Sequence, residues 1–63
     1  MWTIKHRAYG ITVWQGQDAE GRRCYAVTTD REGVAVEPSG ARRLYSMTAV
    51  GEEMASVRTL TTA

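Results

Sequence analysis

The sequence contains one cysteine, one histidine and one proline, and the first two scarcities exclude whole classes of structure. Cys24 has no second cysteine to pair with, so an internal disulfide is excluded, which suits a reducing cytoplasm. One thiol and one imidazole cannot supply the four ligands of a structural zinc site. No apolar run approaches the ~18 residues of a membrane-spanning helix or the ~7 to 15 of a signal-peptide core. We therefore expect a cytoplasmic protein without a membrane partner.

The chain is also short, and its length of 63 residues limits it to a single domain, residues 1–63. A domain of this size buries roughly 60% of the surface that its unfolded chain exposes. Its core supplies only about 3 to 5 kcal/mol of net stability unless a metal, a disulfide or a partner subunit adds to it. We therefore expect a thin core, to which oligomerisation could add stability.

An excess of charge of either sign is absent, because 8 Lys and Arg residues balance 7 Asp and Glu residues to a formal net charge of +1. No overall field therefore draws the protein toward nucleic acid. Every basic residue except Lys5 is an arginine, and four of them stand in the pairs Arg22-Arg23 and Arg42-Arg43. The planar guanidinium group suits phosphate, carboxylate and aromatic partners alike, so these pairs favour contact surfaces.

The first segment, WTIKHRAYGITVWQ, is rich in residues that favour β-strands, and it alternates between two faces. The alternation changes phase near Gly10, where a glycine often marks a bulge or a bend. The pattern predicts strand structure over residues 2–15, either as one long bent strand or as two short ones.

A hairpin is predicted from the stretch CYAVTTDREGVAVEP. Its first strand covers residues 22–29, and residues 30–33 form a type I turn in a loop of three to five residues, with Gly33 at positive φ. Residues 34–37 form the return strand. Pro38 cannot donate a hydrogen bond to a ladder, so the strand ends there or lies at an edge of the sheet.

The C-terminal third changes to a helical period. Thr48 offers an N-cap oxygen for a helix over about residues 48–60, and residues 41–46 form either a fourth edge strand or the approach to that helix. Four apolar residues lie along one face of this helix: Met47, Val50, Met54 and Val57. The predicted fold is α+β, a three- or four-stranded antiparallel meander with one C-terminal helix packed on one face.

A sheet covered by one helix leaves its other face open, and two registers are possible. In the register that we favour, the small residues Cys24 and Ala26 face the helix. The reverse register places Tyr25 and Val27 in the core. The favoured register predicts a binding face with a basic rim, composed of Trp14, Arg23 and Tyr25 on the sheet with Arg22, Arg42 and Arg43 around it.

Catalytic chemistry is not predicted, because a working site needs several groups that this chain holds in single copies. His6 has the character of a solvated strand histidine, and Cys24 that of a small buried apolar residue. We predict no catalytic residue, no metal and no cofactor, and therefore no enzyme.

The order of three strands and one helix, over about residues 9–60, resembles the arm-binding domain at the start of phage tyrosine recombinases, which implies an accessory domain that binds DNA or RNA.

A chain of this length built from a β-meander and one amphipathic helix also resembles the small proteins with which phages and mobile elements block host machinery, anti-CRISPR proteins especially. That resemblance implies stoichiometric binding to a larger host protein or ribonucleoprotein complex, which would block a host defence complex by occlusion. This inhibitor role is our prediction, with nucleic-acid binding as the alternative and a structural homodimer without ligand as the second alternative.

Overall fold

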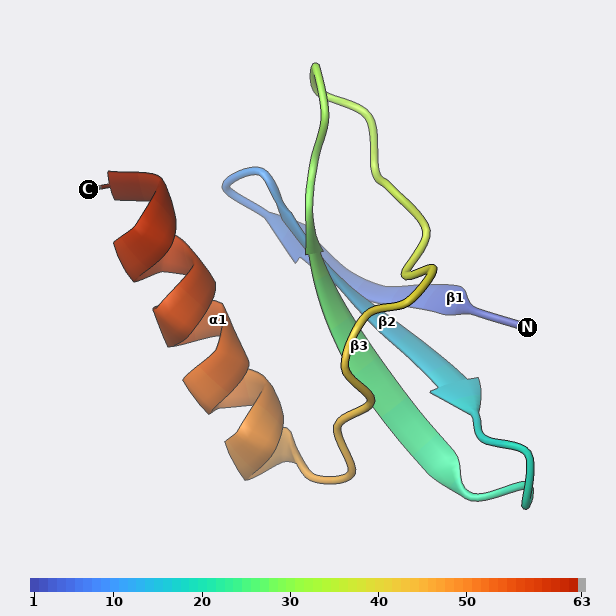
Figure 1. The fold of residues 1–63 in the computed structure, drawn as a ribbon. Helices are drawn as coiled ribbons and strands as arrows, with labels where there is room; N and C mark the ends of the chain where they lie inside the picture. The colour runs from blue at the N-terminus through green and yellow to red at the C-terminus, as the bar shows by residue number, and fades with distance from the viewer. Residues whose placement is uncertain (63) are drawn as a thin grey trace.

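A three-stranded antiparallel sheet and one helix form the protein in a computed structural model, which describes the backbone of residues 1–62 and the side chains of residues 1–58 (Figure 1). Strands β1 (Thr3–Ala8), β2 (Ile11–Gln17) and β3 (Arg23–Thr29) are neighbours in that order, and helix α1 (Met47–Thr62) packs on one face of the sheet. The predicted α+β meander with a C-terminal helix is confirmed. Among residues 1–62 no helix combines the length and the apolar character that crossing a membrane requires.

The predicted strand region 2–15 consists of two strands joined by a tight turn. Tyr9 and Gly10 both have positive φ, 54° and 76°. Ala8 and Ile11 face each other directly across this turn. Positive φ at both central residues is the property of the type I′ turn, whose twist matches that of the strands on either side. The phase change near Gly10 therefore marks a hairpin.

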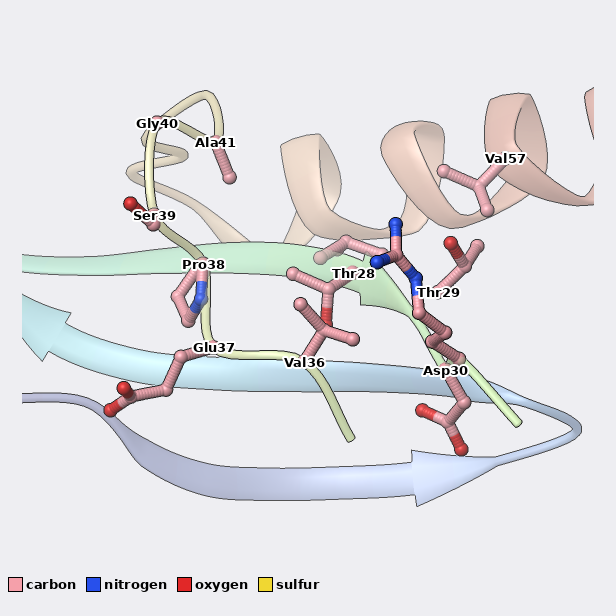
Figure 2. Close-up of a pocket in the computed structure, with 12 residues that line it drawn as sticks. Thr28, Thr29, Asp30, Val36, Glu37, Pro38, Ser39, Gly40, Ala41 and Val57 are labelled. Carbon is pink, nitrogen blue, oxygen red and sulfur yellow. The ribbon is translucent and has the colours of Figure 1, made fainter. Parts of the chain in front are cut away.

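The return strand predicted over residues 34–37 is wrong. After β3 the chain makes a second two-residue turn, in which Arg31 and Val34 exchange backbone hydrogen bonds of 2.9 and 3.0 Å. Its central residues, Glu32 and Gly33, have φ of 53° and 80°, which is the type I′ pattern, so a two-residue loop replaces the predicted longer loop with a type I turn. Beyond Val34 the chain leaves the plane of the sheet and crosses one of its faces (Figures 1 and 2). The segment covers that face instead of adding a strand to an edge.

The crossing segment buries the sheet face that lies opposite the helix. Pro38 is buried within it, and Trp2 packs on the same face, where an ideal Cβ on Gly16 would lie only 2.8 Å from the Trp2 ring. Trp14 donates a hydrogen bond from Nε1 to Thr28 Oγ1 at 2.9 Å. Four side chains of this face are buried: Thr12, Trp14, Cys24 and Ala26.

The opposite face packs against α1 in the register that we did not favour. Tyr25 pairs with Gln15 and Val27 pairs with Val13, so these side chains share one face. Val13, Tyr25 and Val27 belong to the core. The other core residues are Ile11, Leu44 and Val50, and Ala49, Met54 and Val57 pack against this cluster.

The predicted open face carrying Trp14 and Tyr25 is therefore wrong. Only 7% of Trp14 and 9% of Tyr25 is exposed. Because β2 and β3 are covered on both faces, each shows a run of four buried residues, which period-two alternation cannot assign to either side.

The helix begins at Met47, one residue before the predicted start, and its N-cap lies two residues before the predicted one. Ser46 Oγ accepts a hydrogen bond from the Ala49 backbone N–H at 3.1 Å, which makes Ser46 the N-cap in place of Thr48. Met47 then lies in the first turn and is 56% exposed, whereas Val50 is buried. The predicted apolar stripe is confirmed from Val50 onward.

Candidate binding groove at the outer edge of strand β3

The arginines predicted as contact residues are exposed but lie in different settings. Arg22 forms ion pairs with Asp18 at 3.1 Å and Glu20 at 3.2 Å, and its guanidinium lies 5.3 Å from the centre of the Tyr45 ring. A charge neutralised in this way contributes little to a field that attracts phosphate.

The other three predicted arginines, Arg23, Arg42 and Arg43, are exposed on different segments. Arg23 opens β3, whereas Arg42 and Arg43 belong to the connection that leads to the helix. Arg42 lines a hollow of about 220 Å³ together with Glu52 and Glu53 of the helix. Acidic residues thus stand beside two of the four predicted arginines, Arg22 and Arg42.

Strand β3 forms one edge of the sheet, and its outer side is paired at one point. Tyr25 and Leu44 exchange backbone hydrogen bonds of 2.7 and 2.8 Å. Backbone groups alternate in direction along a strand, so Val27 and Thr29 also turn their N–H and C=O groups outward. No backbone group in the described part of the chain pairs with them on that side.

A groove of about 480 Å³ lies along this unpaired part of β3 (Figure 2). Its walls come from three parts of the chain: the end of β3 with Asp30 and Arg31, residues 36–41 of the crossing segment, and Val57 of the helix. The apolar members are Val27, Val36, Pro38, Ala41 and Val57. The groove therefore combines free backbone groups with apolar side chains, which are the two requirements for holding an extended peptide.

A polar network fixes the turn end of the groove. Asp30 accepts hydrogen bonds from Arg7 Nη2 at 2.8 Å and from Thr12 Oγ1 at 3.0 Å. Arg7 Nη2 also donates to the Gly33 carbonyl at 2.6 Å, and the Asp30 backbone N–H donates to the Gly10 carbonyl at 2.7 Å. The Arg7 hydrogen bond is the main cause that holds the pKa of Asp30 below its usual value. All three strands thus hold the second turn in place.

A second network fixes the chain just before the helix. Asp18 Oδ1 accepts the backbone N–H groups of Glu20 and Arg22, both at 2.9 Å, and Oδ2 accepts the Tyr45 hydroxyl at 3.0 Å. The Arg22 backbone hydrogen bond contributes most to lowering the pKa of Asp18. Donation to Asp18 raises the pKa of Tyr45. Tyr45 follows Leu44, so this network holds the connection at the edge of β3.

We expect acid to weaken both networks. The pKa values of Asp18 and Asp30 are lowered in the folded protein, so their stabilising effect is complete above the unfolded-state pKa of about 3.9 and is lost as pH falls through the lower folded values. The urea midpoint should fall steeply below about pH 4. The double variant Asp18→Asn with Asp30→Asn should be less stable at neutral pH, with a flatter profile. An unchanged slope in that variant would contradict this assignment.

Comparison with protein families, with curated proteins and with solved structures finds no match to this chain. Among residues 1–62 no three His, Cys, Asp or Glu side chains come together in a way that could hold a metal ion.

The sequence did not indicate the groove, although it contained partial signals. The sequence predicts a strand that ends at Pro38 or lies at an edge, and it places Val57 in the apolar stripe of the helix. What brings them together is the path of residues 34–41 across the sheet, and neither alternation nor helical period specifies that path.

Proposed function

We propose that this protein is a non-catalytic binding module that accepts an extended segment of a protein partner along the free part of the β3 edge. The observation that carries the proposal is the outward direction of the Val27 and Thr29 backbone groups, which face a groove with apolar walls. A polypeptide supplies N–H and C=O groups at strand spacing, and this match with the edge supports a protein segment as the ligand.

The size of the groove sets the strength of binding. Two outward-facing residues offer about four backbone hydrogen bonds, each worth about 0.5 to 1.5 kcal/mol net. Such bonds alone do not offset the loss of freedom on association. A side chain of the partner must therefore pack against Val36, Pro38 and Val57. Small apolar side chains fit these walls, and we expect an interaction of moderate affinity.

In its specific form, the proposal is that this protein inhibits a larger host complex by occlusion. The layout of the chain implies this class of target. An inhibitor of this kind would bind an extended segment of the complex along β3, and the complex could then not use that segment. Support for it comes from the resemblance in layout and from the open edge.

Two matched variants test the proposal. Val36 lines the groove and is 41% exposed, whereas Val34 lies two residues earlier, is 65% exposed and does not line it. Val36→Arg should fill the groove, and Val34→Arg should leave it open. The unmodified protein and the two variants serve as three baits for capture from a cell lysate. A partner that binds the unmodified protein should also bind Val34→Arg and should not bind Val36→Arg. Amide exchange at Val27 and Thr29 should slow in the complex.

Other results would redirect the assignment. Equal capture by both variants, or unchanged exchange at Val27 and Thr29, would contradict binding at the groove. Retention on heparin with a mobility shift that weakens steeply with salt would indicate nucleic-acid binding. A mass of two chains in light scattering, with no captured partner, would indicate a structural homodimer.

A further inference from the structure

Strand β1 is the edge of the sheet opposite to β3, and its outer side is open. Among the strands it pairs with β2 alone. Residues 3–7 are exposed, and no described backbone group outside β2 pairs with them. An open edge presents a row of N–H and C=O groups that a further strand can pair with.

The open edge is basic. No Asp or Glu precedes Asp18 in the sequence, while Lys5, His6 and Arg7 follow one another in β1. Arg7 is neutralised by Asp30 at 2.8 Å. In the described part of the chain the side chains of Lys5 and His6 form no hydrogen bond or ion pair, so Lys5 leaves an uncompensated positive charge on the strand.

The two faces of β1 differ in chemistry. His6 is paired with Val13, and the register shifts between Ile4 and His6, so Lys5 and His6 together oppose that one residue on the helix side. Ile4 is paired with Trp14 on the other side and is half-exposed. A strand added to β1 would meet positive charge on one face and an apolar side chain on the other.

A second copy of this chain does not complement such an edge. Antiparallel pairing of two β1 strands about Lys5 would set Lys5 of one copy directly against Lys5 of the other. Like charges placed directly across a ladder are destabilising. The charge of the edge calls for a strand that carries Asp or Glu.

We propose that β1 accepts an extended acidic segment of a protein partner as a fourth strand, with acidic residues toward Lys5 and apolar residues toward Ile4. This site is separate from the groove along β3. The cross-strand ion pairs are solvent-exposed, so salt weakens binding.

A capped octapeptide alternating Glu with Val serves as the probe, and one alternating Lys with Val is its control. Binding of the Glu peptide should slow amide exchange in residues 3–7 and leave Val27 unchanged. The Glu peptide should bind several-fold more tightly than the Lys peptide at low salt, and about 0.5 M salt should reduce this difference. Lys5→Glu should reverse the preference. Arg43→Glu, which makes the same change in net charge away from β1, should preserve it.

Three results would overturn the proposal. The first is equal affinity for the Glu and Lys peptides. The second is that the Glu peptide slows amide exchange only at Val27 and Thr29. The third is that light scattering shows a dimer in which the amides of residues 3–7 exchange slowly without any peptide. Failure at β1 leaves the groove proposal intact, because that proposal depends on Val27, Thr29 and the Val36→Arg variant.

Discussion

Trp14→Ala is expected to unfold most of the protein at room temperature. The indole is buried on the sheet face opposite the helix and donates a hydrogen bond to Thr28. Truncating a buried tryptophan to alanine costs about 3 to 5 kcal/mol, which equals the whole stability of about 3 to 5 kcal/mol that a core of this size supplies. Far-UV circular dichroism and urea titration measure the result: the native signal should be lost or the midpoint should approach zero denaturant.

The control for this prediction is Trp14→Phe, which retains an aromatic ring and removes the indole N–H. The lost volume and the unpaired Thr28 hydroxyl should cost about 1 to 3 kcal/mol, so the variant should still fold with a lower urea midpoint. A stable Trp14→Ala protein would show that the crossing segment does not bury this face in solution.

Leu44→Ala is the second large effect, with an expected loss of about 2 to 5 kcal/mol. The Leu44 side chain is buried with Tyr25 and Val50 between the sheet and the helix. Its backbone pairs with Tyr25, and alanine keeps those hydrogen bonds, so the variant isolates the contribution of the side chain. Urea unfolding followed by tryptophan fluorescence measures it.

Met47→Ala is the matched control, because Met47 is also a long apolar residue and lies three positions after Leu44. It is 56% exposed, and surface substitutions of this kind change stability by about 0.5 kcal/mol or less. Similar losses for Leu44→Ala and Met47→Ala would mean that the helix packs through its first turn, as the sequence pattern predicted, and would contradict the observed packing.

The two large effects have one structural origin, which also shapes the groove. Residues 34–38 cover one face of the sheet, and Leu44 lies at its other face beneath the helix. Between these points the chain passes around the edge of β3 and pairs with it only at Tyr25. The groove is the space left at the edge where the connection stands away from the strand. The wrapping that stabilises the sheet therefore also leaves Val27 and Thr29 without a backbone partner on the outer side of β3.

The sequence by itself determined the local structure of this protein. Strand-forming residues and turns specify the sheet, and the apolar stripe from Val50 to Val57 specifies the face that the helix buries. The exclusion of a disulfide follows from composition alone, because Cys24 has no second cysteine.

Only the tertiary structure decided which side chains are buried and which edges are open. Alternation with a period of two shows that a strand has two different faces, but it cannot show whether a distant segment covers the second one. Pro38 and Trp2 supply that cover, which removes Trp14 from the surface, and the helix removes Tyr25. The path of residues 34–44 depends on contacts between residues far apart in the chain, and these contacts leave no local period in the sequence.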